Sequence, residues 1–257
     1  MRFYLGTHHP QWLGRFDAPL FVSHRRLSPR RTLPVALGPW ALDSGGFTEL
    51  SMYGAWQTTP EQYVSAVRRY RDEIGNLAWA APQDWMCEPF MLAKTGMSVR
   101  AHQYRTVANY LQLRELAPDL PFAPVLQGWD IADYEHCAEL YAREGIDLTR
   151  APVVGLGSVC RRQHTTTAET LITRLHEHGI TRLHGFGFKI LGLEKVGHLL
   201  ASADSLAWSY AARRKPPLPG CTTHINCANC SLYAMAWRTR VIAAQHTEPT
   251  HHQPALF

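Results

Sequence analysis

The chain has 257 residues, 46% of them hydrophobic and 18% charged, which is typical of a globular protein with a substantial core. No apolar run approaches the roughly 20 residues of a membrane span, and residues 1–6 are too short an apolar stretch for a secretory signal. We therefore expect a cytoplasmic protein with no membrane partner. The net charge of +5 fits a polyanionic partner without establishing one.

Short apolar stretches alternate with amphipathic ones along the chain. The helix predicted at 59–74 has the clearest signal, because Thr59 can cap it and Pro60 occupies its first turn. In chain order, the pattern predicts strands at 1–7, 19–23, 40–43, 76–81, 121–127, 151–157, 182–185 and 202–208, and helices at 59–74, 98–116, 130–144, 168–178, 192–201 and 231–244. About eight strands alternating with helices predict a parallel sheet. For this length we favour a closed (β/α)8 TIM-type barrel over an open doubly wound sheet.

Six of the predicted strands carry, or are closely followed by, a polar residue or a glycine near their carboxyl ends. In a barrel the carboxyl ends of all strands face one mouth, so these residues would converge on a single cavity. One polar residue at a strand end is a turn, whereas several around one cavity form a site; a turn or cap role for Asp84 and for Asp204 is the alternative. The residues are Asp43, Asp84, Gln127, Gly157, Gly187 and Asp204.

The run ALDSGGF is the strand end with the most chemical groups. Asp43 supplies a carboxylate and Ser44 a hydroxyl, while Phe47 offers an aromatic face for stacking. Gly45 and Gly46 lack a Cβ, so a flat ligand could lie against their backbone. A plain Ser/Gly turn after a strand is the alternative interpretation.

Arginines cluster in predicted loops, where they could contact the phosphates of a nucleic acid. Arg161 and Arg162 form one pair, and Arg213 and Arg214 form another. A scattered, solvated surface is the alternative, because no motif beyond charge supports these residues.

Four soft metal ligands crowd into ten residues near the end of the chain. They are Cys221, His224, Cys227 and Cys230. Thiolate and imidazole groups at this spacing suit a tetrahedral ion, so the sequence predicts a structural zinc site in a cytoplasmic protein. A redox pair and an iron–sulfur site are the alternatives.

The ordered motifs resemble the tRNA-guanine transglycosylase superfamily. They are most similar to its short branch, the deazapurine DNA modification transglycosylases found in phages and bacterial gene clusters, over roughly residues 40 to 235. The motifs are DSGGF at 43–47, Asp84, LQG at 126–128, GLGS at 155–158, HGFG at 184–187 and ADS at 203–205, before the cysteine cluster. The resemblance implies exchange of guanine in DNA for a 7-deazaguanine base such as preQ0.

The resemblance also implies roles for individual residues. Asp204 would attack the sugar C1′ as nucleophile, and Asp43 would act as general acid or base. Asp84 and Gln127 would read the base edge, and Phe47 would stack on the base. Base exchange with retention does need two carboxylates, and a carboxylate with an amide matches the donors and acceptor of guanine. The remaining substrate-binding residues would be Ser44, Gly45, Gly46, Gly128, Gly157, Ser158 and Gly187.

The zinc site departs from the pattern of the superfamily, which has three cysteines as Cys-x-Cys-x2-Cys and a histidine well downstream. This chain has Cys-x5-Cys-x2-Cys, so the fourth ligand is either His224 or His246, and we predict His224. We expect a barrel at 1–214, a zinc-binding segment and C-terminal helix at 215–246, and a disordered tail at 247–257.

Three other functions compete with DNA base exchange. The first is the same chemistry on tRNA, although the compact chain has no extra RNA-binding domain. The second is a non-catalytic, zinc-stabilised nucleic-acid-binding protein, and the third is a barrel hydrolase of small molecules. Duplex DNA would require the base to be flipped out, by this chain alone or with a helper protein.

Overall fold

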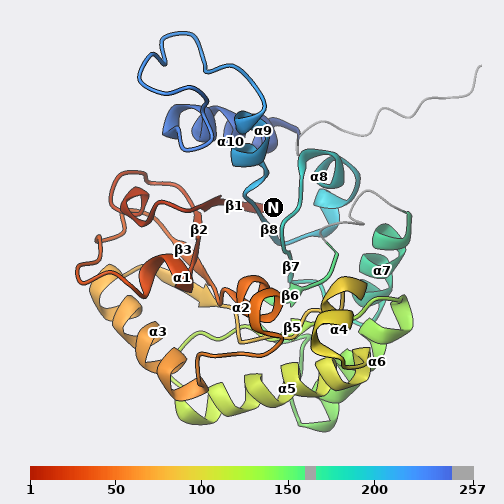
Figure 1. The fold of residues 1–257 in the computed structure, drawn as a ribbon. Coiled ribbons are helices and arrows are strands. Elements are labelled where there is room, and N and C mark those ends of the chain that lie inside the picture. The colour runs from red at the N-terminus through yellow and green to blue at the C-terminus, as the bar shows by residue number, and fades with distance from the viewer. Residues whose placement is uncertain (160–165, 245–257) are drawn as a thin grey trace, which may run out of the picture.

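The computed structural model describes residues 1–159 and 166–244. Figure 1 shows strands arranged in a ring, with most of the helices outside it. The strands are β1 (Arg2–Thr7), β2 (Leu20–Ser23), β3 (Trp40–Asp43), β4 (Leu77–Ala80), β5 (Val125–Leu126), β6 (Val154–Leu156), β7 (Leu183–Gly185) and β8 (Ser202–Ser205). The helices are α1 (His24–Leu27), α2 (Gly46–Tyr53), α3 (Pro60–Ile74), α4 (Pro89–Thr95), α5 (Val99–Leu116), α6 (Ile131–Arg143), α7 (Thr166–Glu177), α8 (Ile190–Val196), α9 (Ala207–Arg213) and α10 (Ser231–Ala244), with short 3-10 turns at Pro10–Trp12 and Gly197–Leu199.

All eight strands belong to one parallel sheet in the order β4-β3-β2-β1-β8-β7-β6-β5. The sheet is curled, and Ala80 in β4 forms an isolated parallel bridge with Phe122, just before β5. There, Ala80 N donates to Pro121 O at 2.9 Å and Ala123 N donates to Ala80 O at 3.0 Å. The predicted α/β fold with a parallel sheet is confirmed, and a fully closed barrel stays a prediction.

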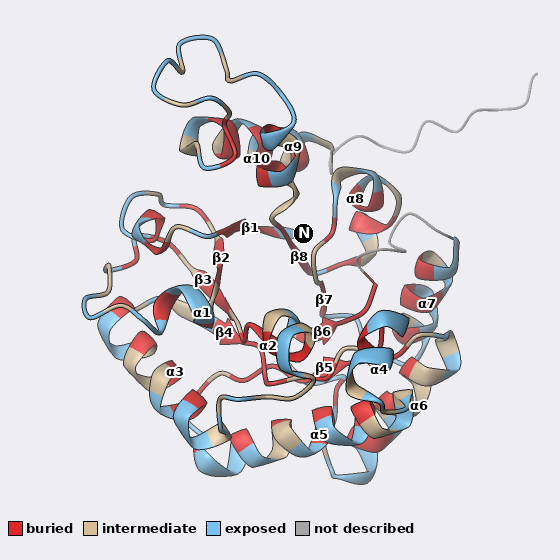
Figure 2. Ribbon diagram, in the orientation of Figure 1, coloured by how far each residue is buried: buried red, intermediate tan, exposed pale blue. Residues whose placement is uncertain are grey.

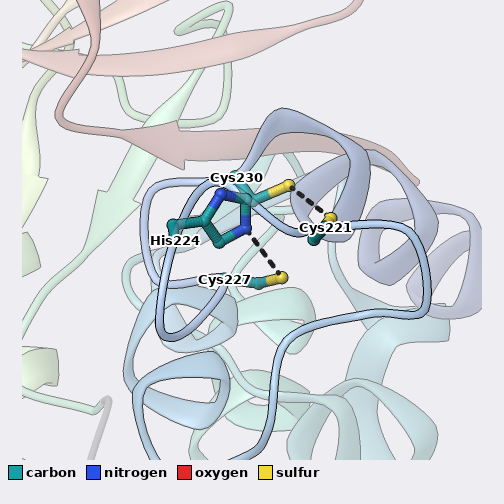
Figure 3. A group of neighbouring side chains, drawn as sticks. All are labelled: Cys221, His224, Cys227 and Cys230. Carbon is teal, nitrogen blue, oxygen red and sulfur yellow. Dashed lines mark hydrogen bonds between the residues drawn. The ribbon is translucent and has the colours of Figure 1, made fainter.

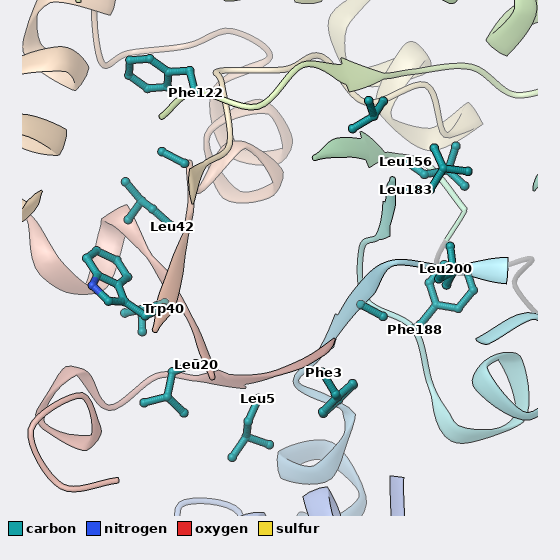
Figure 4. Packing of buried hydrophobic residues seen from close by; sticks show 14 of the residues in the cluster. Phe3, Leu5, Leu20, Trp40, Leu42, Phe122, Leu156, Leu183, Phe188 and Leu200 are labelled. Atoms are coloured by element: carbon teal, nitrogen blue, oxygen red, sulfur yellow. The ribbon is translucent and has the colours of Figure 1, made fainter. Parts of the chain in front are cut away.

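Side chains alternate between the two faces of each strand, as the pleat requires. In β3, Trp40 and Leu42 belong to the large hydrophobic cluster under the helices, whereas Ala41 belongs to a smaller cluster on the inner face. Figure 4 shows Trp40 and Leu42 on the outer side of the strands, and Figure 2 shows the strands buried and the outer helix faces exposed. By the same alternation, Asp43 lies on the inner face, because it is two residues after Ala41. Asp204 also lies on the inner face, because it is next to Ala203, which belongs to the outer cluster.

Helix α3 forms where its capping signal predicts. The Thr59 side chain accepts from Gln62 N at 3.3 Å, and the Gln62 side chain accepts from Thr59 N at 3.0 Å. Such a cap stabilises a helix by about 1 kcal/mol. On its buried face, Tyr63 OH donates to Ala81 O at 2.7 Å, which fixes the helix to the segment that follows β4.

Several elements differ from the predictions. The predicted strand at 121–127 reduces to β5, and the strand at 202–208 ends at Ser205, with Trp208 in α9. Helices α1, α2, α4 and α9 were not predicted, because helices of four to eight residues are too short to show a helical period in an 11-residue window. The tail at 247–257 lies outside the described residues. Among residues 1–159 and 166–244, no helix combines the length and apolarity that a bilayer span requires.

Candidate functional site

A cavity of about 400 Å³ opens at the carboxyl ends of the strands. Most of the predicted substrate-site residues contribute to its wall. Gly45 and Gly128 lie beside it instead: Gly45 N donates to Asp43 Oδ1 at 3.1 Å, and a Cβ at Gly128 would come within 2.8 Å of the Asp133 Cβ. The predicted residues in the wall are Asp43, Ser44, Gly46, Phe47, Asp84, Gln127, Gly157, Ser158, Gly187 and Asp204.

Asp204 is buried in β8 and held through one of its oxygens. Gly187 N donates to Asp204 Oδ1 at 3.0 Å, and His184 Nε2 lies 3.3 Å from the same oxygen. His184 is fully buried, and its Nδ1 lies 2.8 Å from Ser202 Oγ. A neutral imidazole that donates from Nε2 can accept the Ser202 hydroxyl at Nδ1. The contacts with Gly187 N and His184 Nε2 therefore fix the orientation of the Asp204 carboxylate, and both are made by Oδ1 and not by Oδ2.

Asp43 ends β3 in a partly buried position. Its desolvation raises the pKa of the carboxyl, and the nearby charge of Asp204 adds to this, while hydrogen bonds from Gly45 N and the Ser23 side chain act in the opposite direction. Gly45 has a φ of 85°, a left-handed conformation that suits glycine and aims its N–H at Asp43. A carboxyl group in this environment can carry a proton at a higher pH than a free aspartate.

Asp84 and Gln127 form a polar pair in the cavity wall. Gln127 Nε2 donates to Asp84 Oδ2 at 2.5 Å. Burial raises the pKa of Asp84 to about 7, and the charges of Asp43 and Glu88 contribute, while the bond from Gln127 opposes the rise. The Gln127 amide lies against Gly157, so a Cβ at position 157 would collide with this amide and would have to displace it.

Ser158 links this pair to a buried glutamate that the sequence analysis did not identify. Its Oγ lies 2.7 Å from Gln127 Oε1 and 2.8 Å from Glu88 Oε2, and it accepts from Cys87 N at 2.8 Å. Ser158 has a φ of 55°, which is uncommon for a residue with a side chain. No local sequence signal indicates the contact between Ser158 and Glu88, because the two residues are 70 positions apart.

Aromatic and basic groups surround the mouth of the cavity. Phe47 is 53% exposed and its ring centroid lies 6.0 Å from that of Phe90. His8, another residue that sequence reasoning missed, lines the cavity; its pKa is lowered by burial and then by the charges of Arg26, His9 and Arg213.

The structure describes two of the four arginines that were predicted to contact phosphates. Arg213 is near enough to the cavity to affect His8. Arg214 instead places its guanidinium 3.8 Å from the centroid of the Tyr210 ring. Arg161 and Arg162 lie outside the described residues.

The four predicted metal ligands come together, as Figure 3 shows. The ligand atoms of Cys221, His224, Cys227 and Cys230 all lie within 4.8 Å of one another. Cys221 Sγ and Cys230 Sγ are 3.9 Å apart, close to the roughly 3.8 Å expected for a tetrahedron with metal–sulfur bonds of about 2.3 Å. The three cysteines form no disulfide, so the group can hold a metal ion such as zinc. His246 is outside the described part of the chain.

The cysteine cluster is hydrogen-bonded to the segments that follow β1 and β8, and β8 is the strand that contains Asp204. Ser209 Oγ, in α9, donates to Ala228 O at 2.7 Å, and His9 Nε2 lies 3.1 Å from Asn229 Oδ1. In Figure 1, α9 and α10 lie outside the ring beside β1 and β8, and α10 contacts β1, α8 and α9. An ion in this cluster would therefore brace the segment that follows β8.

Comparison with protein families gives one match that covers nearly the whole chain. The model of the family described as DpdA, DeoxyPurine in DNA protein A, matches residues 1–255. The chain matches none of the curated proteins with which it was compared. The family match agrees with the resemblance drawn from the motifs at the strand ends, and that membership suggests a transglycosylase related to deazapurines in DNA. From the match over residues 1–255, the chain belongs to the DpdA family.

Proposed function

We propose that this protein exchanges guanine in DNA for a 7-deazaguanine base such as preQ0. The observation that carries the proposal is that two carboxylates, Asp204 and Asp43, face one cavity together with the pair Asp84 and Gln127. The family description, which refers to a deoxypurine in DNA, supports DNA as the nucleic acid. The cavity of about 400 Å³ falls within the range of small-molecule sites, roughly 300 to 1,000 Å³.

In the first half of the reaction, Asp204 acts as the nucleophile. Gly187 N–H and His184 hold Oδ1, so Oδ2 is the oxygen that attacks the sugar C1′. The C1′–O bond forms as the C1′–N9 bond of guanine breaks, and the electron pair of that bond leaves with the base. Asp43 donates a proton to the departing guanine, which its raised pKa permits.

In the second half, the sugar ester on Asp204 is attacked by the incoming base. The N9 of the 7-deazaguanine forms the new bond to C1′ and releases Asp204 as a carboxylate. Asp43, now ionised, removes the N9 proton, so the enzyme returns to its starting protonation state. Two displacements at C1′ retain the configuration of the sugar.

Recognition of the base falls to Asp84 and Gln127. As a carboxylate, Asp84 can accept from the N1–H and the 2-amino group of guanine. Gln127 donates one N–H to Asp84 and has a second for the O6 of the base. Guanine and 7-deazaguanine share this edge, so the same pair serves the leaving and the incoming base.

Other parts of the molecule would support the reaction. Arg213 and Arg26, near His8, are suited to the phosphates beside a flipped-out nucleotide. Zinc in the cysteine cluster would act as a structural ion. We further propose a closed barrel at 1–214, a zinc-binding segment at 215–246, and a cytoplasmic location, where free thiols persist.

The proposal is tested by nucleoside mass spectrometry after incubation of the protein with preQ0 and either duplex DNA, single-stranded DNA or bulk tRNA. We expect a deazaguanosine in DNA only, none with Asp204→Asn, and product with the exposed control Asp147→Asn. A deazaguanosine found in tRNA alone would show that the substrate is tRNA and not DNA. Absence of product from every nucleic acid would overturn base exchange.

A further inference from the structure

Four side chains form one continuous polar line in the cavity wall. Gln127 Nε2 lies 2.5 Å from Asp84 Oδ2, Gln127 Oε1 lies 2.7 Å from Ser158 Oγ, and Ser158 Oγ lies 2.8 Å from Glu88 Oε2. Gln127, Ser158 and Glu88 are all buried, so water does not readily replace any of these contacts. We call this line the Asp84–Glu88 relay.

The relay contains three contacts, and each needs one hydrogen between its two heavy atoms. The Gln127 amide supplies one hydrogen, because its NH2 group faces one of its two neighbours, Asp84 or Ser158, and its carbonyl oxygen faces the other. Ser158 has a single hydroxyl hydrogen, and its oxygen already accepts from Cys87 N at 2.8 Å. Together they supply two hydrogens for three contacts, so the third must be a carboxyl proton on Asp84 or Glu88. This count is the same whichever way the Gln127 amide is turned.

Resting on the proposed function, we infer that Asp84 and Glu88 share one proton through Gln127 and Ser158, and that Glu88 is a positioning residue that holds this proton while Asp84 binds the base as a carboxylate. The relay has two balanced states. In one, Glu88 donates to Ser158, Ser158 to Gln127 Oε1, and Gln127 Nε2 to the Asp84 carboxylate. In the other, the amide is turned over, Asp84 donates to Oε1, Nε2 donates to Ser158, and Ser158 donates to the Glu88 carboxylate.

Only the first state matches guanine. It presents a carboxylate and an amide N–H to the cavity. The second state uses the Asp84 hydrogen on Gln127 Oε1, so the base meets a neutral carboxyl that accepts weakly from N1–H, and an amide oxygen in place of the N–H that O6 needs. The base therefore selects the first state, and the proton moves to Glu88 instead of to water. The Gln127 Nε2 contact with Asp84 corresponds to this state. The ionisable groups that interact with Asp84 include Asp43, Glu88, Tyr63, Tyr141 and Cys87.

The experiment compares three variants in binding guanine and preQ0 as free bases, measured by calorimetry. Glu88→Gln keeps a donor toward Ser158, so we expect an affinity within about threefold of wild type. Glu88→Ala and Ser158→Ala break the line, so we expect Kd to rise by about tenfold or more. If Glu88 were needed as an anion, Glu88→Gln would be as damaging as Glu88→Ala, and the relay would be overturned.

Infrared difference spectra of base-bound against free protein locate the proton directly. We expect a protonated carboxyl band in the wild-type complex that Glu88→Gln removes. Glu49→Gln is the matched control, because Glu49 is also buried and accepts from Gln57 N at 2.7 Å and Thr58 Oγ1 at 2.7 Å, outside the relay. A wild-type complex without the band refutes the shared proton even if Glu88→Ala does not fold. Wild-type protein that binds neither base overturns the proposed function, whereas binding and exchange without the band overturn the relay alone.

Discussion

His184 Nε2 lies 3.3 Å from Asp204 Oδ1 across two paired strands, and His184 is in register with Ser202. The strand pairing therefore sets the distance between the imidazole and the carboxylate. Ser202 Oγ, 2.8 Å from the other ring nitrogen, fixes the ring from its far side. In the proposed reaction this places a donor on one oxygen of the nucleophile before any substrate arrives.

Replacing His184 should affect the chemical step more than binding. We expect His184→Leu to lower kcat by about tenfold to a hundredfold, with KM little changed, because a preorganised donor is lost. The variant should also lose about 1 to 3 kcal/mol of stability, since Ser202 is left without its buried partner. Single-turnover base exchange and urea unfolding measure the two effects. The exposed His198→Leu is the control, and equal effects from both variants would contradict the role of His184.

The Asp84 carboxyl should make the protein less stable as the pH rises. Its folded pKa of about 7 lies above the ordinary value of 3.8, so the stabilisation is fully present below about pH 4 and is lost as the pH rises through about 7. At pH 8, Asp84→Asn should therefore have a free energy of unfolding up to about 4 kcal/mol greater than that of wild type, as measured by urea unfolding. The same variant should fail to bind guanine. Wild-type and Asp84→Asn curves that stay parallel between pH 4 and pH 8 would refute this.

Gly157→Ala should remove base binding without unfolding the chain. The added Cβ collides with the Gln127 amide, which breaks its contacts with Asp84 and Ser158. We expect a loss of at least about tenfold in affinity for preQ0, with a largely preserved circular dichroism spectrum. Gly197→Ala is the matched control, because a Cβ there meets nothing closer than 3.7 Å and the φ is −59°.

Removal of the metal should cost folding before chemistry. We expect about one zinc ion per chain by elemental analysis, and a large fall in Tm after chelation, because metal binding in such clusters is coupled to folding. Cys227→Ser and His224→Ala should both reduce metal content, whereas His246→Ala should not. Chelated protein with an unchanged Tm would show that the cluster is not a structural site.

The sequence predicted the cavity residues best where their location depends only on standing at or after the carboxyl end of a strand. The common direction of parallel strands was enough to predict that Asp43, Asp84, Gln127 and Asp204 share one cavity. The cysteine cluster was equally accessible, because its ligands lie within ten residues of one another. The interpretation of DSGGF as a plain turn was incomplete, since α2 begins at Gly46.

The missed residues depend on contacts that no local pattern reports. Glu88 contacts Ser158, 70 residues away along the chain, and His8 lines the cavity because it directly follows β1. His184 lies in the HGFG motif, but only the pairing of β7 with β8 places its ring beside Asp204. Period-2 alternation, counted back from Phe186 in the cavity wall, is the signal that could have placed His184 on the inner face.

The isolated bridge between Ala80 and Phe122 is a weakly paired junction, or seam, in the sheet, and the two residues proposed to read the base follow the strands on either side of it. Asp84 follows β4 and Gln127 follows β5, so their hydrogen bond fastens the seam beyond the strand ends. A base held by both side chains would resist separation of the two strands, and its binding energy would reach the backbone at this junction. The backbone amides of Ala80 and Ala123 form hydrogen bonds across the seam. Their hydrogen exchange with solvent would therefore slow when the base binds, because the bound base would make this part of the sheet open less often.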